Sequence, residues 1–506
     1  MAATDFQSPL PPRPVSPELA TDSADLPPPP VSSPPPPESP PSLPTAPVRR
    51  LDPSKIALLI VGLILLIGLL FLVFKVVLPG LKGRGPTSIV NLTYWGLWEP
   101  SATLDAVIAE FESQNPGIKV KYSKQEKFDY RSRLKGRLAK SPGSDTEVPD
   151  IFRLHNTWIP TFTDELAAVP TSTANTIGLN NDYYSIFQRD LAQNGRFLAV
   201  PLMYDSLALY YNKKLLQDAQ VNPPLTWWGL ENAATKLTVR DQNNQITIAG
   251  AALGLTENID HWPDIIGLML LQNGVKPFVA DDPKNDQKLL DVLTYYSLFY
   301  SQLQVWDSSL PESTQAFANG KLAFYFAPSW RTFNLLEINP ALQFEITTAP
   351  QLPTLESASA QSIEQSGSND NLTNIHYATY WAEGVNSKSQ HQAEAFKLLE
   401  FLSRSATLEK MFTAQKQTRE FGEIYPRKSM AGKISTDPRL RPFTVAAPNT
   451  YSFYLASRTW DDSLNSDLSR YFGNALNRLT QDRLDPKDVL PELRNGLTQV
   501  QSKYGL

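Results

Sequence analysis

The sequence contains no cysteine and only four histidines among its 506 residues. The absence of cysteine excludes disulfides, thiolate nucleophiles, iron–sulfur clusters and cysteine-based zinc sites. No histidine has a second histidine at the spacing of metal ligands, so we expect no metal site and no cofactor. The four are His155, His261, His376 and His391.

The motifs that accompany common enzyme chemistries are also missing from the sequence. There is no GxxxxGK[ST] phosphate loop, no GxSxG and no HExxH. The first absence means that any coupled ATPase would be a separate chain, and the other two argue against a serine hydrolase and a zinc peptidase. We therefore expect no catalytic residues.

Charge and size set further limits. The formal net charge of -5 is mild and argues against a nucleic-acid-binding surface. Hydrophobic residues make up 42% of the chain, which is ample for globular cores. The part that follows the first 87 residues, roughly 420 residues long, exceeds what one hydrophobic core usually supports. Two folded lobes are expected.

The N-terminal region has a composition of its own. Residues 1–54 are rich in proline, with the runs Pro27–Pro30 and Pro34–Pro37. Such a segment cannot bury enough apolar surface to offset its ordering entropy, so it is predicted to be a disordered tail. Residues 79–87 are predicted to be a short linker.

An uninterrupted apolar run, Ile56–Phe74, carries no charge and no proline. As a helix it would be roughly 28 Å long, close to the hydrocarbon thickness of a bilayer. We predict a single transmembrane helix over residues 55–78. The flanking cations number three on each side, so charge alone leaves the topology open. They are Arg49, Arg50 and Lys55 before the run, and Lys75, Lys82 and Arg84 after it.

From Ile89 the pattern becomes that of an α/β domain. Residues Ile89–Trp95 have strand composition, and the apolar residues of the next segment fall at helical spacing. An alternating strand begins at Ile118. A strand, a helix and a strand in about thirty residues predict a βαβ unit and a parallel sheet. The helical residues are Leu104, Val107, Ile108 and Phe111.

The same patterns continue along the chain. Further strands or extended segments are predicted at Pro149–Leu154, Val200–Lys213 and Leu322–Phe326, and Thr226 is predicted to cap a helix. Helices are predicted around Ala395–Leu402 and within Tyr451–Leu479. The serine-rich stretch Ser357–Asn374 is predicted to be a surface loop.

Several stretches, taken in order, resemble one known family. The chain resembles the extracellular solute-binding proteins of the maltose-binding-like, sugar-binding type, which serve ABC importers. The stretches are YWGLWEP (94–100), FESQNPGIKV (111–120), PDIFRLHNTW (149–158), VPLMYDSLALYYNKKLL (200–216), PLTWW (224–228), FANGKLAFYFAPSWR (317–331) and FGEIYPR (421–427).

The resemblance implies a periplasmic-binding-protein-like fold with two α/β lobes, each a central sheet flanked by helices. Lobe 1 would comprise residues 88–203 and 384–440, and lobe 2 residues 206–378 and 442–506. A membrane-anchored monomer is implied, because the uncleaved helix replaces the usual lipidated cysteine. Its large C-terminal domain would lie outside the cell or in the periplasm, next to an ABC permease in the same membrane. A carbohydrate would bind between the lobes.

A sugar site needs aromatic faces for C–H groups and polar side chains for hydroxyls. Residues of both kinds lie at predicted strand ends and turns, and parallel sheets place ligands at the carboxyl ends of strands. The candidate ligand-binding residues are Trp95, Trp98, Glu99, Asn156, Trp158, Tyr204, Asp205, Trp330, Arg331, Tyr380, Trp381 and Glu383.

Several alternatives remain open at this point. Trp95 fits core packing as well as ligand contact. For Asp205 we favour hydrogen bonding to ligand or hinge, since a buried carboxylate without a partner is costly. Asp461 and Asp462 are interpreted as a solvated pair rather than a glycosidase dyad. The rivals are a surface glycoside hydrolase and an adhesive surface protein, and within the binding class a peptide or polyol ligand.

Overall fold

The computed structural model describes residues 89–140, 147–354, 359–368 and 370–506. The predicted tail, transmembrane helix and linker of residues 1–87 lie outside this part. Over the described ranges, every helix is too short or too polar to serve as a membrane span. Residues Pro86–Leu506 belong to one compact unit, and all that follows concerns its described residues.

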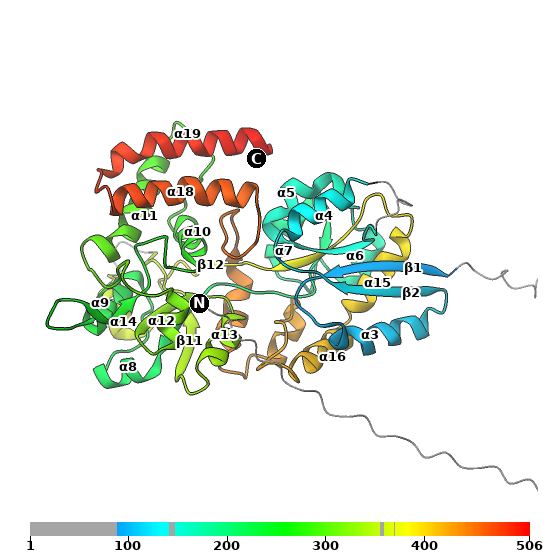
Figure 1. Cartoon of the computed structure of the whole chain (residues 1–506), viewed down its shortest axis with the longest axis horizontal. Helices are drawn as coiled ribbons and strands as arrows, with labels where there is room; N and C mark the ends of the chain where they lie inside the picture. The colour runs from blue at the N-terminus through cyan, green and yellow to red at the C-terminus, as the bar shows by residue number, and fades with distance from the viewer. Residues whose placement is uncertain (1–88, 141–146, 355–358, 369) are drawn as a thin grey trace, which may run out of the picture. The chain divides into compact units, whose positions relative to one another are not determined.

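Five strands form the first sheet, which we call the sheet of lobe 1 (Figure 1). β1 runs parallel to both β2 and β3, as the βαβ pattern predicts, whereas β13 enters antiparallel between β3 and β6. In the sheet order the strands are β2 (Ile118–Lys124), β1 (Val90–Gly96), β3 (Ile151–His155), β13 (Trp381–Val385) and β6 (Ala199–Val200).

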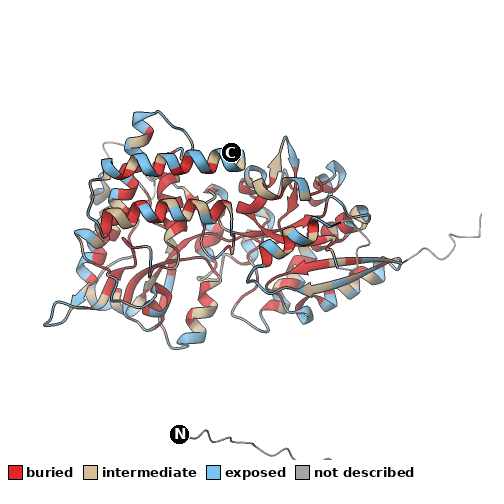
Figure 2. Cartoon of the chain, turned by 45° about the horizontal axis from the view of Figure 1, so that its top comes forward, coloured by how far each residue is buried: buried red, intermediate tan, exposed pale blue. Residues whose placement is uncertain are grey.

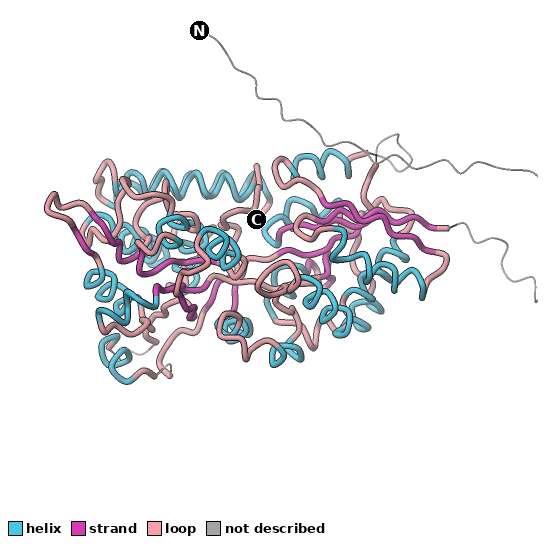
Figure 3. Tube along the Cα trace, turned by 60° about the horizontal axis from the view of Figure 1, so that its bottom comes forward, coloured by secondary structure: helices cyan, strands magenta, loops and turns pink. Residues whose placement is uncertain are grey.

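Five other strands form the sheet of lobe 2. β10 is central and pairs antiparallel with β7 and parallel with β9, while β7 pairs antiparallel with β11 at the edge of the sheet. In the sheet order the strands are β11 (Phe344–Thr348), β7 (Ala208–Asn212), β10 (Leu322–Ala327), β9 (Ile246–Ala251) and β8 (Val239–Arg240). Figure 3 shows the strands of the two sheets as separate groups.

Helices flank both sheets, and their inward faces are buried (Figure 2). Those of lobe 1 are α3 (Ser101–Gln114), α4 (Tyr130–Leu138), α5 (Ile159–Phe162), α6 (Thr171–Ile177), α7 (Ser185–Leu191), α15 (Gln392–Leu402) and α16 (Ser405–Gln415). Those of lobe 2 are α8 (Lys213–Ala219), α9 (Trp227–Leu237), α10 (Trp262–Gln272), α11 (Pro283–Ser301), α12 (Ser313–Ala318), α13 (Arg331–Ile338), α14 (Ala360–Ser366), α17 (Arg441–Ala446), α18 (Leu464–Thr480) and α19 (Pro486–Tyr504).

Two short strand pairs lie outside the two sheets. One is a hairpin of β4 (Ala192–Gln193) and β5 (Arg196–Phe197). The other joins β12 (His376–Tyr377) in parallel to β14 (Thr450–Tyr451). The second pair brings together two segments that are more than seventy residues apart along the chain.

The chain crosses between the two sheets at residues 204–207 and again at residues 377–379, and these two crossing segments lie side by side. The N–H of Leu207 donates to the carbonyl of Tyr377 at 2.8 Å, and the N–H of Thr379 donates to the carbonyl of Asp205 at 3.1 Å. Tyr204 N–H donates to Ile424 O at 2.9 Å. These few backbone contacts are where a hinge between the lobes would have to bend. The exact residue boundaries between the lobes stay a prediction.

Most of the predicted elements are present. β1, α3 and β2 follow the predicted strand, helix and strand, and the buried residues of α3 include Leu104, Val107 and Phe111. Thr226 caps α9 by accepting the N–H of Gly229 at 2.9 Å. At these positions, the local spacing of apolar residues and the capping residue were sufficient to predict the element.

The prediction of a surface loop over Ser357–Asn374 was wrong for Ala360–Ser366, which form α14. Ser359 caps this helix by accepting the N–H of Ser362 at 3.1 Å, and Ile363 is buried. The carboxylate of Glu364 accepts the N–H groups of Leu225 and Thr226. The helix is thus held by a segment far away in the sequence, which local composition does not reveal.

Candidate functional site

A cavity of about 280 Å³, which we call the cleft, lies between the two lobes next to the crossing segments. Its walls come from the strand ends of lobe 1, the start of α13 in lobe 2, and loops near residues 419–423 and 457–460. The lining residues are Trp98, Lys127, His155, Met203, Asp205, Asp264, Pro328, Trp330, Phe333, Asn334, Thr379, Trp381, Arg419, Glu423, Ser457, Arg458 and Trp460.

Tryptophan rings dominate one side of the cleft. The ring of Trp98, just after β1, lies 5.5 Å from that of Trp381 in an edge-on arrangement and 5.4 Å from that of Trp460. Trp381 starts β13 and its ring lies 5.0 Å from the His155 imidazole at the end of β3. Such a cluster holds each ring at a fixed angle and presents C–H-binding faces and edges to the cavity.

On the lobe 2 side, Trp330 precedes α13. Its ring lies 5.8 Å from the buried imidazole of His261 and 4.6 Å from the guanidinium carbon of Arg331. The Phe333 ring lies 4.7 Å from that of Phe421. Aromatic side chains therefore line both lobes, so a flat apolar ligand surface can be contacted from two sides.

Asp205 lies in the first crossing segment and faces the cleft from the hinge. Its Oδ1 accepts the N–H groups of Ser206 at 2.8 Å and Ser329 at 3.1 Å, and its Oδ2 accepts the Ser329 hydroxyl at 2.8 Å. Burial raises the pKa of this carboxyl to about 7, although these hydrogen bonds oppose the shift. Asp205 therefore links the crossing segment to the loop before α13.

His155 is a polar group of the cleft that stays neutral. Burial lowers the pKa of its imidazole to about 3. Nδ1 lies 2.8 Å from the Thr157 hydroxyl, and Nε2 lies 3.1 Å from the hydroxyl of Thr379, another lining residue. An uncharged imidazole at this place can fix the Thr379 hydroxyl without adding charge to the cleft.

Behind the tryptophans, a buried arginine holds two carboxylates. Arg153 on β3 donates to Glu99 at 2.6 Å through Nη1, and to Glu383 on β13 at 2.8 Å through Nε and 2.6 Å through Nη2. Burial opposes ionisation of both acids, but Arg153 holds the pKa of Glu99 below its ordinary value, whereas that of Glu383 is raised. This ion-pair cluster fixes the segments that carry Trp98 and Trp381.

Four of the twelve candidate ligand residues line the cleft: Trp98, Asp205, Trp330 and Trp381. The other eight do not. Glu99 and Glu383 are engaged by Arg153, while Asn156 and Tyr380 both donate to the partly buried carboxylate of Asp190 at 2.9 Å. Trp95, Trp158 and Tyr204 are buried in the core. Arg331 donates to His261 at 2.9 Å and pairs with Asp260 at 3.1 Å.

Sequence reasoning missed the lining residues that loops supply. Arg419 and Glu423 follow α16, and Ser457, Arg458 and Trp460 precede α18. Arg458 and Trp460 have positive φ angles of 56° and 50°, a strained conformation that is often found at functional sites. The tryptophan beside two aspartates at 460–462 was the available signal, but only the fold shows that it reaches Trp98.

The interpretation of Asp461 and Asp462 as a solvated pair was wrong for Asp461. Its side chain is buried and pairs with Arg131 at 2.9 Å, and its Oδ2 accepts the N–H of Asn465 at 3.0 Å. Asp462 is more than half exposed and pairs with the same arginine at 2.8 Å. Within the described residues, no group of three or more metal-binding side chains is arranged to hold an ion.

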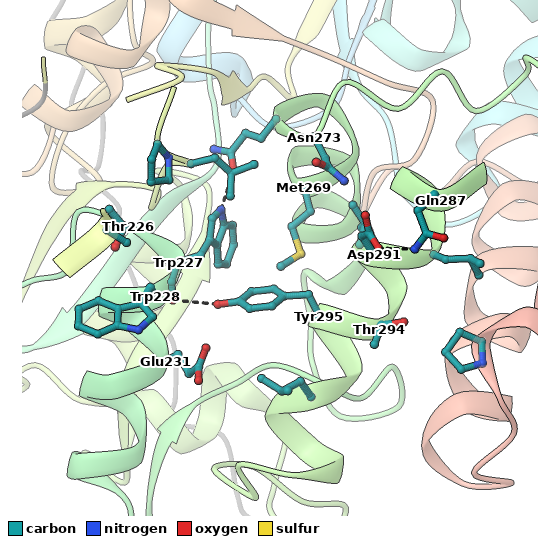
Figure 4. Close-up of a pocket in the computed structure, with 18 of the residues that line it drawn as sticks. Thr226, Trp227, Trp228, Glu231, Met269, Asn273, Gln287, Asp291, Thr294 and Tyr295 are labelled. Carbon is teal, nitrogen blue, oxygen red and sulfur yellow. Dashed lines mark hydrogen bonds between the residues drawn. The ribbon is translucent and has the colours of Figure 1, made fainter. Parts of the chain in front are cut away.

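A larger cavity of about 660 Å³ lies within lobe 2 (Figure 4). It is mainly apolar and lies among α9, α10 and α11, where Trp227, Met269 and Tyr295 form its walls. The Tyr295 hydroxyl donates to the Trp227 carbonyl at 2.9 Å. All of its lining residues belong to lobe 2, so lobe movement would not enclose a ligand there. The cleft is therefore the candidate site.

Comparison with known proteins gives an independent result. The sequence model of the family described as bacterial extracellular solute-binding protein matches residues 106–430. The folds of many solved structures are similar to this one, among them sugar-binding proteins of ABC transporters.

Three of these structures illustrate the similarity. A cyclo/maltodextrin-binding protein with maltotetraose has a TM-score of 0.61 and 14% identity, covering 83% of this chain and 98% of its own. A maltose-binding periplasmic protein of Listeria monocytogenes with maltose has a TM-score of 0.59 and 16% sequence identity, and the match covers 82% of this chain and 98% of that protein. A solute-binding protein of Thermotoga lettingae with α-D-tagatose has a TM-score of 0.58 and 19% sequence identity, and the match covers 81% of this chain and 99% of that protein.

Proposed function

The chain belongs to the bacterial extracellular solute-binding proteins, and we propose that it captures a carbohydrate, an oligosaccharide, in the cleft and delivers it to an ABC permease. The observation that carries this proposal is the ring cluster of Trp98, Trp381 and Trp460 facing Trp330 across a cavity with polar side chains. Aromatic faces suit the C–H surfaces of sugar rings, and the polar groups suit their hydroxyls.

Capture would proceed by closure of the lobes about the crossing segments. A ligand that contacts Trp98 in lobe 1 and Trp330 in lobe 2 interacts with both only when the lobes are together. It therefore favours the closed state by its differential affinity, and the permease would recognise that state. Asp205, which joins the crossing segment to Ser329, is placed to transmit the movement.

The anchoring and the partners are part of this proposal. The apolar run within residues 55–78 would hold the chain in the membrane as a monomer, with residues 88–506 outside the cell or in the periplasm beside the permease. Protease added to intact cells (to spheroplasts if the cell has an outer membrane) should then digest the C-terminal part and spare the N-terminal tail. Protection of the C-terminal part after this treatment would contradict the orientation.

A thermal-shift screen of the purified full-length chain tests the carbohydrate proposal. A ligand that binds only the native state raises stability by about 2.7 kcal/mol at 100 times its dissociation constant. We expect a rise in Tm with one class of oligosaccharide, weakened by Trp330→Ala. Trp228→Ala, which removes an exposed tryptophan of lobe 2 outside the cleft, is the matched control. Shifts with peptides or polyols alone would overturn the ligand class, and hydrolysis of the sugar would favour a glycoside hydrolase.

A further inference from the structure

We propose that the carbohydrate bound in the cleft carries an anionic group, as a uronic acid or a sulfated sugar does. This inference rests on the proposed carbohydrate-binding function and narrows its ligand class. In the cleft, the acidic groups are already engaged by the protein, whereas part of the positive charge is left for a ligand.

The acidic groups of the cleft are engaged. The carboxylate of Asp264 accepts the N–H of Ser457 at 2.9 Å and lies 3.7 Å from Nδ1 of His261. Glu423 pairs with Arg419 at 2.8 Å. A carboxylate that already accepts hydrogen bonds or pairs with a guanidinium has less capacity left for sugar hydroxyls.

Asp205 is the third acidic group of the cleft, and its carboxylate is also engaged by the protein. Both of its oxygens accept hydrogen bonds from Ser206 or Ser329. Because burial raises the pKa of Asp205 to about 7, part of its negative charge is lost near neutral pH. The cleft therefore offers a ligand few strong acceptors.

The basic groups are less fully engaged. Lys127, at the exposed edge of the cleft, forms no ion pair with an acidic side chain of the described ranges, and its ammonium lies 5.4 Å from the Trp460 ring. Arg419 pairs with Glu423 through Nη2, but its buried Nε lacks a hydrogen-bond partner in the described part of the chain. Arg458 is paired with Asp260, outside the cleft.

Closure of the lobes increases the energetic cost of the unpaired positive charge in the cleft. When the lobes close, water leaves the cleft, and a cation without a counter-charge becomes costly to keep there. A neutral sugar supplies hydroxyl oxygens to the Lys127 ammonium and to the Nε of Arg419, but it cannot balance the charge of Lys127, since Arg419 is already paired with Glu423. A carboxylate or sulfate next to the Trp460 ring supplies acceptor oxygens and also balances the positive charge, through charge-assisted hydrogen bonds. The ligand chemistry that fits best is thus a sugar ring with one attached anion.

The test is calorimetric titration of the full-length chain with matched disaccharides. Each neutral disaccharide is compared with its C6 uronic acid and its 6-O-sulfate, which differ from it only at that position. We expect an anionic form to bind about tenfold more tightly than the neutral form. The preference should shrink in 0.5 M NaCl, because Lys127 lies at an exposed edge where salt screens charge.

Variants assign the preference to the lysine. Lys127→Gln should reduce the ratio of anionic to neutral affinity, and Lys127→Arg, which keeps the charge, should restore it. Lys236→Gln, the same charge change at an exposed position of α9, should leave the ratio unchanged. A preference that survives Lys127→Gln in full would overturn the assignment.

Two further outcomes separate this inference from the proposed function. If the neutral disaccharides bind as tightly as their anionic forms, the inference fails while the carbohydrate function stands. If no carbohydrate of either kind binds, whereas peptides or polyols do, the proposed function itself fails and the inference falls with it.

Discussion

The guanidinium of Arg131 in α4 contacts the carboxylate of Asp461 at 2.9 Å, and both side chains are almost completely buried. α4 packs in lobe 1, where Tyr130 donates to the carbonyl of Arg153 at 2.8 Å. Asp461 lies in the loop just before α18 of lobe 2 and follows Trp460, whose ring lines the cleft. The ion pair therefore joins the two lobes beside the ligand site.

Arg131→Met should destabilise the chain by about 3–5 kcal/mol, because it leaves the buried Asp461 carboxylate without its cation. Asp462→Ala removes the exposed partner of the same arginine, and its loss should be about 1 kcal/mol or less. Urea unfolding of both variants measures the difference. Equal losses of unfolding free energy would mean that the buried Arg131–Asp461 pair contributes no more to stability than the exposed Arg131–Asp462 pair.

Asp205 should make stability depend on pH. Its pKa is raised from 3.8 to about 7 by burial, so the folded chain holds this proton more tightly than the unfolded chain. The resulting stabilisation is fully present below pH 3.8 and is lost as the pH rises through about 7. Between pH 5 and pH 8 the loss should reach about 2–3 kcal/mol.

Asp205→Asn tests this, because an amide resembles the protonated acid and does not titrate. The free energy of unfolding of the variant, minus that of the wild type, should increase from pH 5 to pH 8 in urea titrations at both values. A difference that stays constant or decreases would show that the carboxyl does not carry the raised pKa.

The fold was largely predictable because its early elements follow local rules. Apolar residues at helical spacing gave α3, and Thr226 gave the start of α9. α14 was missed because the partner of Glu364 is the backbone at Leu225 and Thr226, about 140 residues upstream. The contacts that hold this serine-rich helix in place therefore lie outside its own local sequence.

The candidate site was predictable only in part. The predicted turn after the first strand drew attention to Trp98, and the predicted return crossing drew attention to Trp381; both line the cleft. The same reasoning selected Glu99 and Glu383, which are engaged by Arg153 instead. Sequence position gives the end of a strand but not the direction of each side chain. Trp460 was not found because its place beside Trp98 depends on how the C-terminal segment returns to lobe 1.

Trp460→Ala should weaken binding of the carbohydrate found in the thermal-shift screen by about 10- to 100-fold, since an aromatic contact in a desolvated site contributes about 1–3 kcal/mol. Calorimetric titration measures the affinity. Trp228→Ala is the control, because Trp228 lines only the apolar cavity of lobe 2. If both variants bind as the wild type does, the ring cluster is not the ligand surface.

Glu364→Ala should cost about 1–3 kcal/mol of stability, because it removes the acceptor for two backbone N–H groups and for the Thr226 hydroxyl at 2.7 Å. Gly229→Ala should destabilise the chain by the same route, since an added Cβ would lie 2.1 Å from the Glu364 carboxylate oxygen and push it away. The two losses should not add in the double variant, where the carboxylate is already gone. Full additivity in urea unfolding would mean that the glycine serves a different contact.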